Sequence, residues 1–307
     1  MLSVILRVPL LRLARIIGAG LLAAAVLGGC SVLRLTYGQA PELAYWWLDG
    51  YVDIQDSQAA RVRESVAAWF RWHRATQLPE YAAQLARLRR ELAEPVTPAQ
   101  ACRWWGEVRG HMDTAFERAV PSMAEFVVSM SPQQLKHLEQ RYAKAITEAR
   151  RDFLQADREE RRRASVKRVV ERAESLYGRL DDEQRLRVAD LAAQSPFDPE
   201  RWIAERAQIH QEIVAALSRV IAGRGTPDEA QAVLRSLAAR VKQSPRPAHR
   251  EYQQRLVEHN CAFAARIHNL TTPEQRLHAQ NKLAGWEADL RVIAGNGGAA
   301  SPAPGSL

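Results

Sequence analysis

One local motif recurs along the chain and marks where helices begin. In each copy a capping residue is followed three positions later by Gln or Glu, and the two side chains can satisfy the free backbone amides at a helix start. Most copies also place proline at the first helical position. The copies begin at Thr97, Ser131, Asp181, Thr226 and Thr272. We therefore expect helices to start at these positions.

Between these starts the apolar residues recur at helical spacing, and no stretch alternates convincingly with a period of two. We expect residues 132–178 to form the longest helix and Pro121 to kink or split the helix before it. The starts are spaced too unevenly for a repeat array. The sequence therefore predicts an all-α fold, an irregular multi-helix bundle of antiparallel helices in a single domain over residues 41–294. A Gly-, Ala-, Ser- and Pro-rich tail at 295–307 should be disordered.

The N-terminus has the features of a lipoprotein leader. Residues 16–29 are fourteen apolar positions without a charge, preceded by arginines. That length suits the core of a signal peptide and is too short to span a bilayer comfortably. Gly28 and Gly29 place small side chains before Cys30, whose thiol would accept a diacylglyceryl group. We expect a cleaved signal helix over residues 1–29; the alternative is an uncleaved amphipathic anchor with a chance cysteine.

Acylation of Cys30 would attach the chain to a membrane. A diacylglycerol on the thiol and an acyl chain on the freed amine anchor a protein more firmly than one chain does. We expect these covalent lipids and no other cofactor. Ser31 stands where aspartate would retain a lipoprotein in the inner membrane. By resemblance to lipoprotein sorting rules, this predicts the periplasmic leaflet of the outer membrane, with residues 30–40 as the lipidated tether.

Two further cysteines, Cys102 and Cys261, remain once Cys30 is acylated. In an oxidising periplasm such a pair is a candidate disulfide. The alternative is two buried free thiols, because two cysteines alone cannot decide between the states.

An aromatic-rich stretch follows the tether and opens at Pro41. It contains Tyr45, Trp46, Trp47 and Tyr51. One interpretation is a helix packed into the core. The alternative is contact with a membrane surface or a ligand, because Trp and Tyr favour such interfaces.

The chain is mildly basic. It has 43 Lys and Arg against 35 acids, a net charge of +8; removing the three leader arginines leaves 40 against 35, or +5. Spread over a surface of this size, that charge is weak evidence for a polyanionic partner, and we expect no nucleic-acid partner. The charge-rich segment between Arg150 and Arg172 is either a solvated helix or a basic surface that meets lipid or a polyanion.

The patterns of known catalytic and metal sites are missing from the sequence. None of the eight histidines belongs to His-Glu-x-x-His or follows a glutamate by three residues. Cys102 and Cys261 lack the spacing of metal ligands. There is no Gly-x-Ser-x-Gly, phosphate-binding glycine-rich loop or dinucleotide fingerprint. We therefore assign no catalytic and no metal-binding residues.

Several motifs together resemble a family of uncharacterised proteobacterial lipoproteins. They are the site at Cys30, the stretch from Tyr45 to Tyr51, Trp72-His73-Arg74 with Leu78-Pro79-Glu80-Tyr81, and Thr272-Pro273-Glu274-Gln275-Arg276. The resemblance covers nearly the whole mature chain. It implies an envelope location and an all-helical fold, and it supplies no catalytic residues.

A second resemblance concerns two of the capping motifs. Met130-Ser131-Pro132-Gln133-Gln134 and Leu180-Asp181-Asp182-Glu183-Gln184 look like the Leu-Thr-x-x-Gln motif of periplasmic chaperones of the Spy/CpxP type, although neither copy has both Leu and Thr. Such a resemblance implies a protein that binds other chains.

Together these expectations favour a lipid-anchored envelope protein without catalytic activity that binds a protein partner or unfolded chains. One alternative is a carrier of lipid or another hydrophobic ligand in the periplasm, which would need an apolar cavity. A third is an unrecognised hydrolase of envelope polymers, which would need a cleft with two carboxylates or a Cys-His pair. The sequence does not indicate an oligomeric state.

Overall fold

The structure, a computed structural model, describes residues 32–295, and every regular element in that range is helical. The all-α prediction is confirmed. The chain forms two units, Met1–Gln39 and Ala40–Leu307, and residues 40–295 make up the helical domain. The predicted signal peptide, Cys30 and the tail beyond residue 295 lie outside the described residues.

The elements follow one another with short connections. In chain order they are α2 (Val32–Val52), α3 (Asp56–Trp72), the π-helix η1 (His73–Gln77), α4 (Leu78–Glu91), α5 (Pro98–Ser129), α6 (Pro132–Phe153), α7 (Arg158–Tyr177), α8 (Asp182–Ala193), α9 (Pro199–Ala222), α10 (Pro227–Lys242), α11 (Pro247–Asn269) and α12 (Pro273–Gly295).

All five predicted helix starts are confirmed. At the start of α5, Gln100 N donates to Thr97 Oγ1 over 3.2 Å and Thr97 N donates to Gln100 Oε1 over 2.9 Å. The same reciprocal pair of bonds forms at the starts of α6, α8, α10 and α12. Local capping chemistry therefore sets these boundaries.

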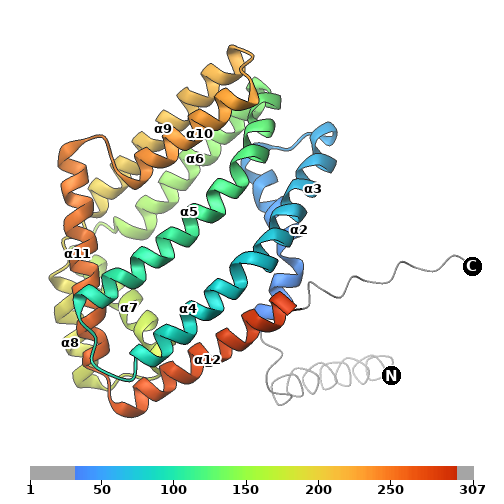
Figure 1. The fold of residues 1–307 in the computed structure, drawn as a ribbon. Coiled ribbons are helices and arrows are strands. Elements are labelled where there is room, and N and C mark those ends of the chain that lie inside the picture. The colour runs from blue at the N-terminus through green and yellow to red at the C-terminus, as the bar shows by residue number, and fades with distance from the viewer. Residues whose placement is uncertain (1–31, 296–307) are drawn as a thin grey trace, which may run out of the picture. The chain divides into compact units, whose positions relative to one another are not determined.

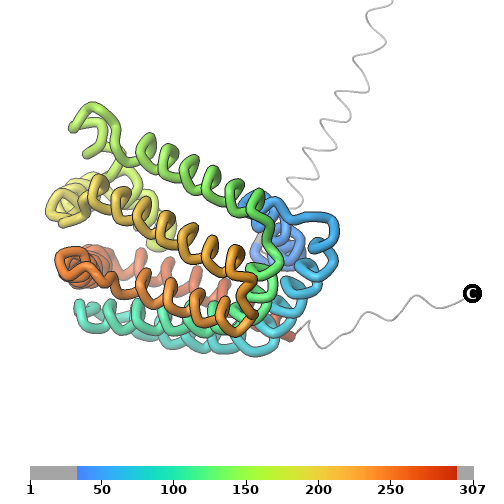
Figure 2. The backbone as a smooth tube through the Cα atoms, turned by 90° about the horizontal axis from the view of Figure 1, so that it is seen from above, coloured from blue at the N-terminus to red at the C-terminus, as the bar shows by residue number. Residues whose placement is uncertain are grey.

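The helices of the domain pack largely side by side. Helices α6, α9, α10 and α5 follow one another in space in that order, and α4 lies along α12 (Figures 1 and 2). Helix α11 crosses α5 and contacts α8, and α7 packs on α8 and α12, whereas α2 lies at the opposite end of the domain (Figure 1). The domain therefore has an α2 end and an α7–α8–α11 end.

Buried apolar residues gather in separate clusters between these helices. One cluster joins α5, α6, α9 and α10 and includes Val127, Leu138, Leu217 and Leu234. Another joins α4, α5, α11 and α12 around Leu92, Ala101, Cys261, Ala265 and Leu283. Smaller clusters lie between α7, α8, α11 and α12 and between α6 and α9. Each cluster holds together helices from distant parts of the sequence.

Pro121 does not split its helix, so the part of the prediction that expected a break is wrong. Helix α5 runs without interruption from Pro98 to Ser129 with Pro121 inside it. An internal proline costs on the order of 3 kcal/mol through its lost hydrogen bond. The flanking residues Val120, Ala124 and Val127 are buried, so packing on both sides of the proline offsets this cost.

The predicted long helix over residues 132–178 is two helices, and that prediction is wrong. Helix α6 ends at Phe153, and Leu154 has a non-helical backbone with φ −121° and ψ 50°. Asp157 then caps α7, because its carboxylate accepts bonds from Glu159 N at 3.0 Å and Glu160 N at 3.1 Å. A carboxylate at a helix start also interacts favourably with the helix dipole.

The first described helix starts earlier than expected. Helix α2 begins at Val32, so the segment predicted as a tether is helical from that residue. Pro41 lies inside the helix and does not open it, which corrects the predicted start. The next helix begins at Asp56 with Gln55 as its cap.

Candidate functional site

The structure separates the four aromatic residues of α2 into two groups. Tyr45 is buried, with 5% of its surface exposed, and Tyr51 is half-buried. Trp46 and Trp47 are each 61% exposed. The two tyrosines therefore belong to the packed interior, whereas the two tryptophans are available for contact with another molecule.

Trp46 and Trp47 form one apolar surface with Leu43, which is 54% exposed. We call these three residues the tryptophan surface. Leu43 lies three positions before Trp46 and four positions before Trp47, which places the leucine beside both tryptophans on the helix. Gly50 continues this face without a side chain, and nothing lies within 4 Å of the position a Cβ would take. Clustered exposed apolar side chains of this kind mark interaction sites.

Arg63 of α3 stands beside this surface. Its guanidinium carbon lies 3.6 Å from the centre of the Tyr45 ring and 5.7 Å from that of Trp46. Arg63 Nε also donates to Glu42 Oε1 over 3.3 Å. The arginine thus stacks on an aromatic ring and offsets the charge of the nearest acid on α2.

A row of rings fixes Trp47 to the interior. The ring centres of Trp47 and Tyr51 are 4.7 Å apart, and Tyr51 meets Tyr142 of α6 at 6.5 Å. Tyr142 stacks on His210 of α9, with 3.9 Å between centres and 12° between planes. Burial, with a smaller effect of Arg206, lowers the pKa of His210 to about 4, so the imidazole is neutral at pH 7.

The turn after α2 is fixed by side-chain bonds. Asp53 has a left-handed backbone with φ 52°, which is uncommon outside glycine. Gln134 of α6 donates to the carbonyl of Asp53 over 2.9 Å, and Ile54 N donates to Asp49 Oδ1 over 2.9 Å. These bonds hold α2 against α6 and so fix the direction in which the tryptophan surface points.

Cys102 and Cys261 form a disulfide between α5 and α11, with 5.1 Å between their Cα atoms. Cys261 is 5% exposed and belongs to the cluster between α4, α5, α11 and α12. The alternative of two free thiols is therefore wrong for this structure. The bond lies in the packed interior, where it holds the first third of the chain to the last.

A second row of rings lies at the π-helix, which the sequence patterns did not indicate. His73 stacks on Trp69 with 4.7 Å between ring centres, and Tyr81 lies 5.4 Å from His73 and 4.7 Å from His111 of α5. Burial lowers the pKa of His73. Isolated π-turns often occur at functional sites, and the aromatic neighbours of His73 pack against its ring.

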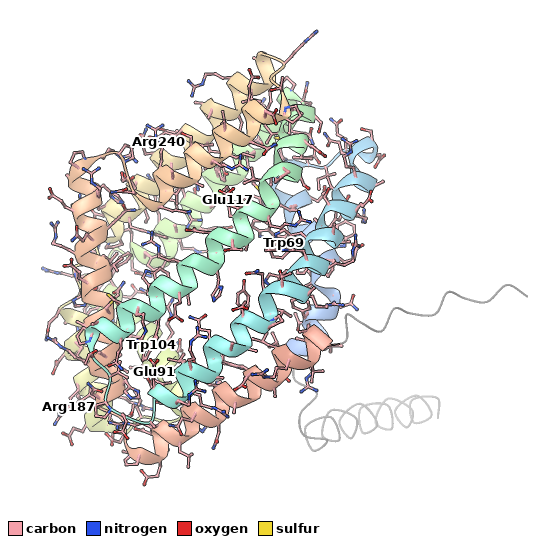
Figure 3. All side chains as sticks on the ribbon, in the orientation of Figure 1. Trp69, Glu91, Trp104, Glu117, Arg187 and Arg240 are labelled. Carbon is pink, nitrogen blue, oxygen red and sulfur yellow. A yellow bond between two sulfur atoms is a disulfide. The ribbon has the colours of Figure 1, made fainter. Side chains whose placement is uncertain are left out.

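Between α4 and α5 this row continues into polar contacts. Trp104 Nε1 donates to Glu91 Oε2 over 2.6 Å, and Figure 3 labels both residues on their facing helices. Arg87 donates to Glu107 over 3.2 Å across the same space. These contacts join α4 to α5.

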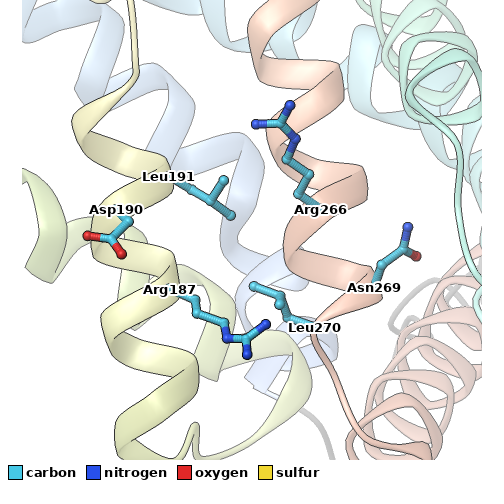
Figure 4. A pocket seen from close by; sticks show the side chains of 6 residues that line it. All are labelled: Arg187, Asp190, Leu191, Arg266, Asn269 and Leu270. Carbon is cyan, nitrogen blue, oxygen red and sulfur yellow. The ribbon is translucent and has the colours of Figure 1, made fainter.

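Two hollows on the surface of the described domain are open and partly charged. One has about 420 Å³ and lies between α8 and α11 (Figure 4), lined by Arg187, Asp190, Leu191, Arg266, Asn269 and Leu270. The other has about 210 Å³ between α9 and α10, with Glu212, Arg219 and Arg240 in its lining. No sequence pattern pointed to either hollow, because each combines residues from separate helices.

Metal-binding and membrane-spanning features are missing from the part of the chain that the structure describes. Within residues 32–295, no three His, Cys, Asp or Glu side chains are grouped so that they could hold a metal ion. None of the helices in the same range has the length and apolarity needed to cross a bilayer.

Comparison with known proteins places the chain in a family. A family model described as a family of unknown function, DUF6279, matches residues 50–250. No curated protein and no solved structure matches the chain. The matched segment begins in the last turn of α2 and ends in α11, so the tryptophan surface lies just before it. Because the match covers more than half of the 307 residues, the chain belongs to DUF6279, a family of unknown function.

Proposed function

We propose that this protein is a non-enzymatic, lipid-anchored envelope protein whose helical domain rests on the lipid surface through α2 and offers its other helices to a protein partner. The observation that carries the proposal is the tryptophan surface. Trp46 and Trp47 are 61% exposed and follow Cys30 by only 16 and 17 positions. An acylated Cys30 would hold these indoles close to the lipid head groups.

The chemistry of the tryptophan surface suits a membrane interface. Indole combines an apolar body with an N–H donor, and tryptophan is enriched at the head-group level of membranes. Burying roughly 100 Å² of each exposed indole would contribute about 2.5 kcal/mol per indole, or about 5 kcal/mol for the two. That contribution is small beside several acyl chains. The surface would therefore set the orientation of the domain, and the lipid would supply the attachment.

This orientation would leave the far end of the domain free. Helix α2 lies at one end, and α7, α8 and α11 lie at the other (Figure 1). Docking through Leu43, Trp46 and Trp47 would point the second end away from the lipid. This arrangement favours a binding role, because a protein partner can reach the helices that lie farthest from the membrane.

A lipid carrier needs an enclosed apolar cavity for the acyl chain. The hollows between α8 and α11 and between α9 and α10 are open, and arginines contribute to both linings. Membrane-surface docking needs only exposed apolar side chains, which α2 provides. We therefore favour binding over carriage.

Two measurements test the proposal. Labelling of cells with palmitate should mark the wild-type protein and be lost in Cys30→Ala. Vesicle flotation then tests α2 without the lipid, using the mature chain with Cys30→Ser and vesicles containing phosphatidylglycerol. We expect this chain to float with the vesicles and the variant Trp46→Ala/Trp47→Ala to bind at least tenfold more weakly, since about 1.4 kcal/mol corresponds to a factor of ten.

Trp105→Ala is the matched control for flotation. Trp105 is a 43% exposed tryptophan on α5, outside the tryptophan surface, so its removal should leave vesicle binding unchanged. Equal flotation of the wild-type chain and the double variant would refute docking through α2. Palmitate labelling that persists in Cys30→Ala would refute the anchor.

A further inference from the structure

We propose that the hollow between α8 and α11 binds an acidic segment of a partner protein, with Arg187 and Arg266 each receiving a carboxylate of that segment and Leu191 and Leu270 receiving a neighbouring apolar side chain. We call this site the α8–α11 hollow. It is an open hollow of about 420 Å³ on the surface of the domain. The proposal concerns a different site from the tryptophan surface.

Both arginines have capacity left for a ligand. Arg266 has a single hydrogen bond, a long one of 3.5 Å from Nη1 to Gln194 Oε1. Arg187 donates to Glu183 Oε1 over 2.6 Å within α8, and its side chain is 58% exposed. A guanidinium has five N–H donors, so most donors of both groups remain open to an incoming carboxylate.

The other polar residues of the hollow are an acid, Asp190, and an amide, Asn269. Asp190 is the acid in the lining, and Figure 4 shows its carboxylate directed away from α11 while both guanidinium groups lie toward the space between the helices. The Asn269 amide is already occupied, because it donates to Val96 O over 2.9 Å and accepts from Val96 N over 2.8 Å. The Asn269 side chain is therefore held in place at the edge of the hollow and is not expected to bond to the ligand.

The combination of groups selects an acidic residue next to an apolar one. Arginine matches a carboxylate with two parallel bonds. Leu191 and Leu270 are half-buried and line the same hollow, so they would be covered by an apolar side chain of the partner. An open hollow of this kind accepts a chain segment that continues past it on both sides.

Phosphate groups of a lipid surface could also meet arginines, but position favours a protein. The hollow lies at the end of the domain opposite α2 (Figure 1). If α2 rests on the membrane, the hollow points away from that surface. The preference for a protein over a lipid surface rests on the proposed function, whereas the charge and shape of the hollow are independent of it.

Peptide binding tests the site directly. The probes are a fluorescein-labelled peptide of four Glu-Leu repeats and the matching peptide of four Gln-Leu repeats, titrated with the full-length protein in neutral nanodiscs and corrected against empty nanodiscs. We expect the Glu-Leu peptide to bind at least tenfold more tightly than the Gln-Leu peptide. Arg266→Gln and Arg187→Gln should each weaken binding about fivefold, the effect of an exposed ion pair of about 1 kcal/mol.

Arg255→Gln is the control, because Arg255 is an arginine of the same helix with its side chain 57% exposed, and this variant should bind like the wild type. Equal affinity for the two peptides, no binding at millimolar concentration, or unchanged binding in Arg266→Gln would each overturn the proposal. Displacement of the peptide by phosphatidylglycerol vesicles would assign the site to lipid instead. None of these readouts depends on Trp46 or Trp47, so the two proposals fail separately.

Discussion

Gln184 and Gln275 exchange a pair of amide hydrogen bonds between the starts of α8 and α12. Gln184 Nε2 donates to Gln275 Oε1 over 2.8 Å, and Gln275 Nε2 donates to Gln184 Oε1 over 2.9 Å. The same nitrogens donate to the carbonyls of Leu270 and Arg179. Because each glutamine also completes a capping box, the starts of α8 and α12 are fixed to each other.

Gln58 and Gln134 repeat this arrangement at the starts of α3 and α6. Gln134 Nε2 donates to Gln58 Oε1 over 2.8 Å, and the reverse bond measures 3.3 Å. Gln134 also donates to Asp53 O and Gln58 to Ser129 O. The domain thus contains two junctions in which paired capping glutamines also satisfy the carbonyls of adjoining turns.

The first prediction concerns the Gln184–Gln275 junction. Gln184→Ala should lower the free energy of unfolding by about 1–3 kcal/mol, since it leaves buried polar groups without partners. Gln275→Ala should act similarly. The double variant should cost less than the sum of the two, with a coupling of at least about 0.5 kcal/mol. Urea denaturation of the four proteins measures the cycle.

Gln133→Ala serves as the control for this cycle, because Gln133 is an exposed glutamine in the first turn of α6. It should change stability by less than about 0.5 kcal/mol. Additive losses in the double variant would show that the two amides act independently, against the prediction.

The second prediction concerns the disulfide. Cys102 and Cys261 are separated by 159 positions, and closing so long a loop in the unfolded chain corresponds to at most about 5 kcal/mol of stabilisation. Reduction should therefore lower the unfolding midpoint. The variant Cys102→Ser/Cys261→Ser should show the lowered midpoint with and without reductant. An unfolding midpoint of the wild-type protein that is the same with and without reductant would contradict the prediction.

The third prediction is a pH dependence that involves His210. Its pKa is lowered to about 4, from 6.5, by burial and by Arg206. The unfolded chain therefore binds a proton between pH 6.5 and 4 that the folded chain does not, so the stabilisation is complete above pH 6.5 and is lost as the pH falls toward 4. NMR titration of the folded protein should give a His210 pKa near 4.

His210→Phe separates this titration from packing. Phenylalanine can keep the stack on Tyr142 without binding a proton, so the loss of stability between pH 7 and 5 should be smaller in the variant. Part of the loss should persist, because burial lowers the pKa of other histidines as well, including His249 and His268. Identical pH profiles of wild type and variant would count against a role for His210.

The fourth prediction concerns the junction between α9 and the start of α11. Arg246 donates to Glu205 Oε2 over 3.0 Å and to Glu212 Oε1 over 2.8 Å. The Glu205 side chain is only 11% exposed. Arg246→Ala would leave this carboxylate with only Ser244 and His249 beside it, which should cost about 1–3 kcal/mol in unfolding free energy.

Arg255→Ala is the comparison for that variant. Arg255 and Glu251 form an exposed pair at 3.9 Å, whose loss should cost less than about 1 kcal/mol. Thermal unfolding of the two variants beside the wild type measures the difference. Equal midpoints for Arg246→Ala and Arg255→Ala would show that burial of Glu205 does not amplify the effect.

Residues whose chemistry is satisfied within one turn could be predicted from the sequence. Thr97 and Gln100 lie three positions apart, so their reciprocal bonds need no other part of the chain. The same holds for the starts of α6, α8, α10 and α12. Asp157 shows the limit of this reasoning, because its cap on α7 depends on the end of α6 at Phe153, which the apolar pattern of residues 132–178 did not indicate.

Features that depend on distant contacts could not be read from the sequence. The tolerance of Pro121 depends on the buried surroundings of α5, and the pairing of Gln184 with Gln275 joins residues 91 positions apart. Tyr45 is buried and Trp46 is exposed, although the two residues are adjacent in sequence. The α8–α11 hollow likewise needs Arg187 and Arg266 from separate helices, with no motif around either.

The contact between α4 and α12 has a consequence for how the chain reaches this fold. Helix α4 ends at Glu91, and its main partner begins only at Pro273. A chain made from the N-terminus would complete α4 long before α12 exists, so the apolar side of α4 stays uncovered during synthesis. Distant contacts of this kind slow folding. We therefore expect the domain to complete its folding only after the last helix has been synthesised.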